Sequence, residues 1–364
     1  LVGSEMCIRD SISSDKNFQK KLLIFNDWLN DKERYKGEDV NIVPHKSSEA
    51  SGFSNETFSC QVQGRNINED IVLRIKPTGF QVFPEYDLGL QVEIMNELRK
   101  FNLPVPEILF SELNENTIGA EFYVMKYISG EAPSDNPPYH MDPKGMMGKA
   151  SHKQRRSVWL GWLDHLVSLH MLNFEELDLS LFKQRAEEDC HLKADLIYYK
   201  SFMEWGMDGE ENSFLNEVFH CLIENIPSSF NPKKLCWGDS RIGNVLFDDF
   251  KVKSLLDWEM ATIGDPLCDL AWGLTTDDVS SHGLNIEKLA GTISNDEAIK
   301  IWEKETGFSA ENFFYYRILC LFKFSVIMIR VAKKLIHSEI MPLDSDFHIK
   351  NHVSNYLKKE FSDK

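Results

Sequence analysis

The sequence predicts an α+β protein with a small β-rich N-terminal lobe and a larger helical C-terminal lobe. Between about residues 52 and 128, short segments alternate apolar and polar side chains, as half-buried strands do. After about residue 151, apolar residues recur at helical spacing over long stretches. The last strand of the first half breaks at Ser129-Gly130, as a linker would. We therefore expect one lobe over residues 12–128, a second over residues 129–364, and a cleft between them.

The elements of the first half follow from local patterns. Apolar residues at helical spacing predict a helix over residues 15–35, and a small-residue turn at 52–55 leads into an alternating strand. The segment "DIVLRIK", residues 70–76, predicts a second strand. Residues 88–101 carry a helical stripe that ends before two prolines, and residues 121–128 predict a further strand that meets the linker.

The second half combines helices with one hairpin. Residues 134–145 have the composition of a loop, and residues 156–172 have the pattern of a helix. Residues 313–335 form the longest apolar region, but Arg317, Lys323 and Arg330 interrupt it, so we expect a buried helix and no membrane span. Two apolar runs, residues 244–247 and 254–256, flank the polar turn 248–251 and predict a β-hairpin.

Composition excludes some partners and sites. The chain has 364 residues and a formal net charge of -17, with no basic block that would follow a nucleic-acid backbone, so we expect no nucleic-acid partner. Its seven cysteines form no C-x-x-C pair and lack the spacing of zinc ligands. Reduced, mostly buried thiols are typical of a cytoplasmic protein, which is the location we expect.

The first residues, "LVGSEMCIRDS", lack a starting Met and have neither the basic region nor the apolar core of a signal peptide. They resemble the translated adapter remnant found at the ends of assembled environmental sequences. We therefore expect residues 1–11 to be non-native and to lie outside the fold, with the natural start missing.

The hairpin carries a group of polar residues at its open end. Asp239 precedes the first strand together with Asn244, five residues later, and Asp257 follows the second strand. An Asp beside a bound hydroxyl can accept its proton or orient it. An Asn oxygen and a second Asp can hold Mg²⁺ on the phosphates of a nucleotide. Because both acids end apolar strands, a solvated turn explains this group less well than a phosphoryl-transfer site does.

The segments "WGDSRIGNVLF" and "LLDWEMATIGDPLCDLAW" resemble the aminoglycoside phosphotransferase and choline kinase-like family, whose fold is protein-kinase-like. The similarity runs from about residue 45 to 275 and is strongest to the branch sometimes fused to acyl-CoA dehydrogenases. It implies that Asp239 is the catalytic base, that Asn244 and Asp257 bind Mg²⁺, and that ATP is the phosphate donor. Trp237 departs from the family, which has His before Gly-Asp.

The resemblance also implies a nucleotide site in the N-terminal lobe. Gly52, Phe53, Ser54 and Asn55 resemble a turn that covers phosphates. The strand cation is Arg74, with Lys76 as the alternative because both share a strand face. Adenine is expected against the linker near Met125 and Tyr127.

Helical periodicity turns Gln91 inward, toward Arg74, and Glu93 outward. Protein kinases use a Glu to orient the strand cation, so Gln91 would orient Arg74 by hydrogen bonding only.

Three further residues surround the predicted catalytic loop. The family resemblance implies that Asp269, in "GDPLCDLAW", braces the backbone of that loop, and we expect His170 to be a structural hydrogen-bonding residue. Arg241 has two alternatives: it contacts a phosphate, or it forms a salt bridge with Asp269. The basic run at residues 149–156 is expected to be a solvated helix start.

The resulting hypothesis is an ATP- and Mg²⁺-dependent phosphotransferase acting on a hydroxyl of a small-molecule acceptor. The cations of residues 149–156 and the branch resemblance favour a hydroxyacyl-CoA or a similar acid derivative. One alternative is an aminoglycoside- or choline-type kinase. Another is a non-catalytic nucleotide-binding module. Gln91 and Trp237 favour this alternative, whereas the presence of all three of Asp239, Asn244 and Asp257 argues against it. A protein kinase does not fit, because no activation segment of the usual length lies between Asp257 and Pro266.

Overall fold

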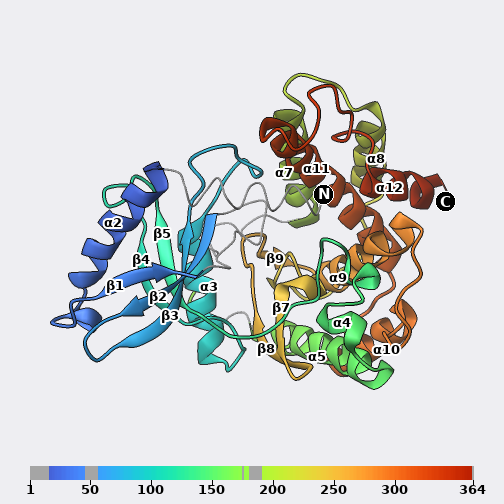
Figure 1. The fold of residues 1–364 in the computed structure, drawn as a ribbon. Helices are drawn as coiled ribbons and strands as arrows, with labels where there is room; N and C mark the ends of the chain where they lie inside the picture. The colour runs from blue at the N-terminus through green and yellow to red at the C-terminus, as the bar shows by residue number, and fades with distance from the viewer. Residues whose placement is uncertain (1–15, 46–55, 174–175, 180–190, 363–364) are drawn as a thin grey trace.

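The computed structural model describes residues 16–45, 56–173, 176–179 and 191–362. The predicted non-native segment 1–11 and the phosphate-covering turn Gly52, Phe53, Ser54 and Asn55 lie outside these ranges. The chain has an α+β protein-kinase-like fold, in which an antiparallel sheet is followed by a helical region (Figure 1). The described helices and strands of the first part are α2 (Lys16–Asn30), β1 (Asn41–Pro44), β2 (Glu56–Gln63), β3 (Asn68–Ile75), α3 (Leu88–Lys100), β4 (Ile108–Glu112) and β5 (Phe122–Lys126).

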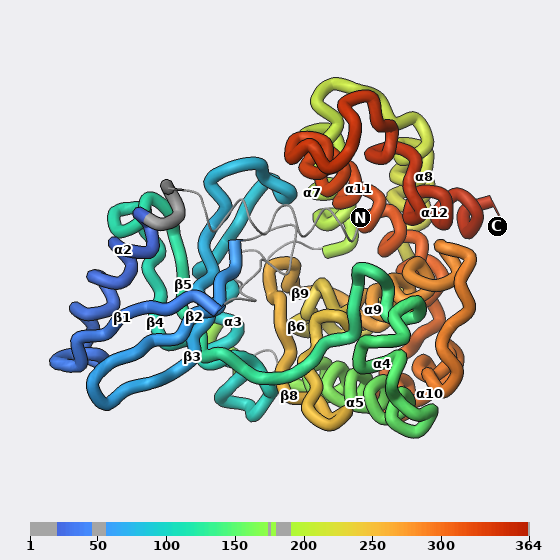
Figure 2. The backbone as a smooth tube through the Cα atoms, viewed as in Figure 1, coloured from blue at the N-terminus to red at the C-terminus, as the bar shows by residue number. Residues whose placement is uncertain are grey.

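The second part is mainly helical, and in Figure 2 the segment after β5 crosses to it from the sheet. Its strands are short and form two two-stranded sheets, β6 with β9 and β7 with β8. The bounds are α4 (Met146–Lys149), α5 (His152–His170), α7 (His191–Met207), α8 (Ser213–Glu224), β6 (Lys234–Cys236), β7 (Val245–Asp248), β8 (Lys251–Leu255), β9 (Thr262–Gly264), α9 (Leu267–Ser280), α10 (Asn295–Thr306), α11 (Phe313–His337) and α12 (His352–Ser362).

The five-stranded sheet has the order β1-β2-β3-β5-β4 and separates two environments. On one face, alternate residues such as Leu73 pack with Phe25 and Leu29 of α2 in a small hydrophobic core. On the opposite face lie Arg74 and its cross-strand partner Tyr123, as strand alternation predicts. The sequence analysis missed β1 and β4, which are only four and five residues long.

A second and larger hydrophobic core joins α3 to the helical part of the chain. Its centre is α11, which packs against α7, α8, α9 and α12. Of the charged residues that interrupt α11, Lys323 and Arg330 are buried and Arg317 is partly buried. The Lys323 ammonium pairs with Asp195 at 3.0 Å. The prediction of a buried helix is confirmed, and in the described part of the chain no helix has the length and apolarity needed to span a membrane. The described cysteines (Cys60, Cys221, Cys236, Cys268 and Cys320) are not in disulfide bonds.

The predicted β-hairpin is present as β7 and β8, which pair antiparallel. Its turn residues Asp249 and Phe250 have φ values of 46° and 60°. Positive φ at both central positions is the geometry of a type I′ turn, whose twist matches that of paired strands. The hairpin therefore has its tip at residues 249–250 and its open end at Asn244 and Leu256, where Leu256 N donates to Asn244 O at 2.8 Å.

The loop between β3 and α3 is fastened to the helical part by Arg330 of α11. The guanidinium lies 4.1 Å from the ring centroids of both Phe80, in this loop, and Trp205, in α7. It also donates to the carbonyl of Gln81 through Nε, at 3.1 Å, and Nη2, at 2.8 Å. Planar stacking together with a two-pronged hydrogen bond is a combination that only Arg can provide.

Replacing Arg330 by Lys should therefore destabilise the protein although the charge is kept. The loss of stacking and of the forked hydrogen bond is expected to lower the free energy of unfolding by about 1–3 kcal/mol, measured by urea denaturation. The matched control is Arg65→Lys, because Arg65 and its partner Asp39 are both strongly exposed. That control should change stability by less than about 0.5 kcal/mol. Equal effects in the two variants would contradict the fastening role of Arg330.

Candidate active site

Asp239 lies in the loop after β6 with both carboxylate oxygens bonded. Oδ1 accepts the indole N–H of Trp272 at 2.6 Å, and Oδ2 accepts Asn244 Nδ2 at 2.8 Å and Arg241 Nε at 3.0 Å. Burial raises the pKa of this carboxyl, with a further increase from Asp257, and the positive charge of Arg241 opposes the shift. The three donors fix the carboxylate in one orientation and leave a lone pair of Oδ1 for a further donor, such as a hydroxyl.

The backbone of this loop is held by Asp269, near the start of α9. Asp269 Oδ2 accepts the N–H of Trp237 at 2.6 Å, and Oδ1 accepts the N–H of Gly238 at 2.8 Å. Gly238 has φ +85°, and a Cβ there would lie 1.9 Å from the carbonyl oxygen of Met260. Only glycine fits this approach. The predicted bracing role of Asp269 is confirmed.

His170, at the end of α5, supports Asp269 from the protein interior. Trp302 Nε1 donates to His170 Nδ1 at 3.0 Å, so Nδ1 is an acceptor and the proton must lie on Nε2. His170 Nε2 then donates to Asp269 Oδ2, 3.2 Å away. This neutral, fully buried imidazole has the structural role that the sequence predicted.

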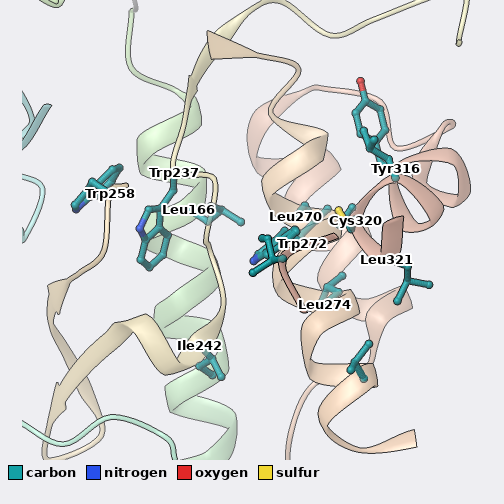
Figure 3. Close-up of a cluster of buried hydrophobic side chains, with 14 of the residues drawn as sticks. Leu166, Trp237, Ile242, Trp258, Leu270, Trp272, Leu274, Tyr316, Cys320 and Leu321 are labelled. Atoms are coloured by element: carbon teal, nitrogen blue, oxygen red, sulfur yellow. The ribbon is translucent and has the colours of Figure 1, made fainter. Parts of the chain in front are cut away.

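Trp237 connects the loop of Asp239 to the segment that carries Asp257. Its indole Nε1 donates to the carbonyl oxygens of Leu256, at 2.8 Å, and Asp257, at 3.2 Å. Its ring lies beside that of Trp258 in Figure 3, with centroids 5.5 Å apart and an interplanar angle of 26°. A tryptophan at this position thus provides both a hydrogen bond and stacking surface.

Asn244 and Asp257 provide oxygen atoms at the open end of the hairpin. Asn244 Nδ2 is bonded to Asp239, which leaves Oδ1 as the atom available to a metal ion. Asp257 has φ 61°, a sparsely populated conformation that is common at functional sites. Hard oxygen donors suit Mg²⁺, which takes few protein ligands and completes its shell with phosphate and water. Among the residues that the structure describes, no group of three or more His, Cys, Asp or Glu is arranged for a metal.

Arg74, on strand β3, extends from the sheet to the segment that carries Asp257. Its Nη2 donates to Asp257 Oδ1 at 2.8 Å and to Glu259 Oε2 at 3.3 Å. Burial alone would lower the pKa of Arg74, but Asp257 and Glu259 raise it, so the guanidinium stays charged. Its buried Nε has no hydrogen-bond partner in the described part of the chain. Lys76, the alternative, pairs instead with Glu121 at 2.6 Å, and its backbone N–H donates to the carbonyl of the same residue.

Gln91 points inward and Glu93 is partly exposed, so the predicted helix orientation is confirmed. The predicted bond from Gln91 to Arg74 does not appear among the described hydrogen bonds. Gln91 Oε1 instead accepts the hydroxyl of Tyr123 at 3.0 Å. The Tyr123 hydroxyl stays protonated at neutral pH, because burial raises its pKa to about 12.

Arg241 does not pair with Asp269, whose oxygens are taken by the loop amides and His170. It bridges Asp239, at 3.0 Å, and Asp135, in the loop before α4. The expectation of a salt bridge with Asp269 was therefore wrong. Phosphate contact by Arg241 stays a prediction.

The basic run at residues 149–156 is an exposed helix start, as expected, except at Arg155. The helix α5 does begin there, capped by Ser151. Arg155, however, is buried and donates to the carbonyls of Met147, Gly148 and Ala290, and Arg156 pairs with Glu297. These two cations hold elements together and no longer support an anionic acceptor.

Met125 and Tyr127, the residues predicted beside adenine, lie on the sheet face that carries Arg74 and just after strand β5, respectively. Met125 is opposite Val72 in the strand register and is partly buried. Tyr127, just after β5, is 41% exposed, and its ring stacks on that of His45 at 5.9 Å. Their contact with a nucleotide stays a prediction.

The sequence analysis did not single out Glu259 or Trp272 as site residues. Glu259 lies two residues after Asp257, with the buried Trp258 between them. The spacing of two acids around one Trp, at residues 257–259, was the available signal that Glu259 lies near Asp257.

The profile of the phosphotransferase enzyme family matches residues 49–299, more than half of the chain. The chain belongs to this family. Human acyl-CoA dehydrogenase family member 11 is 26% identical over 288 residues, which is 76% of this chain but 34% of that protein. The chain thus matches about a third of the length of this relative.

Solved structures share the fold. A candidate aminoglycoside phosphotransferase from Ralstonia eutropha superposes with a TM-score of 0.69 at 17% identity, covering 93% of this chain and 98% of that one. An aminoglycoside phosphotransferase bound to ADP gives a TM-score of 0.50 at 16% identity, covering 92% and 96%. Both identities are low, so these likenesses show the fold alone.

Replacing Asp269 by Asn tests the bracing of the loop. An amide offers one acceptor oxygen where the carboxylate offers two, so one loop N–H loses its partner. The free energy of unfolding is expected to fall by about 2–4 kcal/mol in urea denaturation. Asp249→Asn is the matched control, because Asp249 is exposed and its φ of 46° suits Asn. A stable Asp269→Asn variant, equal to this control, would refute the bracing role.

Proposed function

We propose that the protein is a cytoplasmic, ATP- and Mg²⁺-dependent phosphotransferase that phosphorylates a hydroxyl of a small molecule. The observation that carries the proposal is the Asp239 carboxylate, oriented by Trp272 and Asn244 beside a buried arginine and a second carboxylate. Membership of the phosphotransferase family supports the reaction class.

The chemistry follows from what each side chain can do. Asp239 accepts a hydrogen bond from the acceptor hydroxyl and aligns its oxygen with the γ-phosphorus of ATP. As the new O–P bond forms, the bond to the bridging oxygen breaks, ADP leaves, and the hydroxyl proton passes to Asp239. Arg74 stabilises charge on the phosphate oxygens, and its unpaired Nε is a donor that a phosphate can use.

Asn244 and Asp257 would hold Mg²⁺, which would supply charge neutralisation at the phosphates. The adenine would lie near Met125 and Tyr127, and Gly52 to Asn55 would cover the phosphates. The fold shared with an ADP-bound phosphotransferase supports this nucleotide site.

For the acceptor, we propose a hydroxylated acyl-CoA or a similar acid derivative. Its support is the similarity to relatives named as acyl-CoA dehydrogenase family members, of which this chain matches about a third. Arg155 and Arg156 contribute nothing to this proposal, because both are engaged within the protein.

Asp239→Asn tests the proposed chemistry. Loss of the proton acceptor should lower turnover by about 10²- to 10⁴-fold, while binding of Mg-ATP stays near the wild-type value. Turnover is measured on an acceptor found by phosphotransfer profiling of a metabolite extract, and binding is measured calorimetrically. Asp249→Asn is the control and should leave both unchanged. Wild-type turnover in Asp239→Asn would remove Asp239 from the mechanism.

The acceptor class is tested by direct comparison. Purified protein with Mg-ATP is offered a set of hydroxyacyl-CoA thioesters and, separately, aminoglycosides such as kanamycin, with phosphorylated products detected by mass spectrometry. We expect a product from the thioesters and little from the aminoglycosides. Efficient phosphorylation of the aminoglycosides alone would reject the acyl-CoA proposal and keep the phosphotransferase assignment.

A further inference from the structure

We propose that Glu259 is the positioning residue for Arg74, a role that the helix α3 does not fill in this protein. The inference rests on the proposed function for its catalytic meaning. Its structural part stands on contacts within the chain alone: the guanidinium of Arg74 bonds to Asp257 and Glu259, both on the segment after β8.

The geometry of that segment presents two carboxylates to one cation. Trp258 is buried, stacks on Trp237 and donates from Nε1 to the carbonyl of Leu255 at 3.3 Å. Its neighbours Asp257 and Glu259 therefore project away from this anchor, and both contact Nη2 of Arg74. The side chain of Glu259 is only 10% exposed, less than the 20% of Asp257. Glu259 is thus a partner inside the protein, not a solvated charge near it.

Glu259 gives the buried Arg74 a second carboxylate partner besides Asp257. Arg74 is 8% exposed, and an unpaired buried cation is strongly unfavourable. Asp257 is also the proposed Mg²⁺ ligand, so its oxygens would serve both Arg74 and the metal ion. The α3 helix presents Gln91, which is neutral and whose carbonyl oxygen already accepts the hydroxyl of Tyr123. Among the two acids that pair with Arg74 in the described part of the chain, Glu259 is the one that can hold Arg74 while Asp257 binds Mg²⁺.

The consequence is a cation held between the two parts of the chain. Arg74 belongs to the sheet, and Glu259 to the segment between β8 and β9. The position of Arg74 therefore depends on contact of the sheet with the helical part and not on the orientation of α3.

The first experiment tests the pairing without any nucleotide. The variants Glu259→Gln, Arg74→Met and the double variant form a double-mutant cycle, followed by urea denaturation. We expect the Glu259→Gln substitution to lower the denaturation midpoint in the wild-type background and to have little effect in the Arg74→Met background. Equal effects in the two backgrounds would overturn the inference, whatever the protein binds.

The second experiment tests positioning for the nucleotide, with dissociation constants for Mg-ADP from calorimetry. Glu259→Gln should weaken binding by about tenfold or more, because Arg74 loses its second anchor and turns further toward Asp257. Glu259→Asp keeps the charge and should retain most of the affinity. The matched control is Glu121→Gln, the partner of the neighbouring Lys76, which should bind as the wild type does.

The outcomes separate this inference from the proposed function. Wild-type affinity in Glu259→Gln, or an equal loss in Glu259→Asp and Glu259→Gln, would overturn the positioning role. A wild-type protein that binds no Mg-nucleotide would refute the proposed function, and the double-mutant cycle would still decide whether Glu259 holds Arg74. If Glu259→Gln does not fold, the Glu259→Asp variant and the single Arg74→Met variant provide the comparison.

Discussion

The carboxylate of Asp269 receives two consecutive backbone amides and one imidazole N–H, and the position of Asp239 depends on these bonds. A hydrogen bond to a charged acceptor contributes about 1.5–3 kcal/mol, more than a neutral one. Asp269 also lies in the first turn of α9, where the helix dipole favours a negative charge. The same helix supplies Trp272, which bonds to Asp239 directly. One helix thus fixes both the backbone of the loop and the orientation of its carboxylate.

A second constraint is the pair of tryptophans behind the site. Trp237 belongs to the loop of Asp239 and Trp258 to the segment of Asp257, so their stacking brings two distant stretches of chain into one arrangement. The stacked rings are apolar and buried, which excludes water from the back of the site. Figure 3 shows the two tryptophan rings side by side. Asp257 and Glu259, which pair with Arg74, are the chain neighbours of the buried Trp258.

The sequence alone correctly predicted the features that depend on local residue pattern. Alternation and a polar turn predicted the hairpin, and the same alternation put Arg74 on the face opposite Leu73. The choice between Arg74 and Lys76 required their ion-pair partners, which lie far away in the sequence: Asp257 and Glu259 for Arg74, and Glu121 for Lys76. The partner of Gln91 could not be predicted, because Tyr123 comes from another strand. Arg155 was expected in solvent, but carbonyls from α4 and from the loop before α10 surround it in the folded chain.

The larger hydrophobic core includes α3 and the loop that Arg330 fastens, in addition to the helices of the second part. The smaller core contains only the outer face of the sheet with α2 and its neighbours. Hydrophobic packing therefore divides the chain along the sheet itself, with one face belonging to each core. Cooperative unfolding follows packing more closely than it follows chain order. The helix α3 and the helical part should consequently lose their hydrogen-exchange protection together, whereas α2 and β1 can open first, without exposing the site.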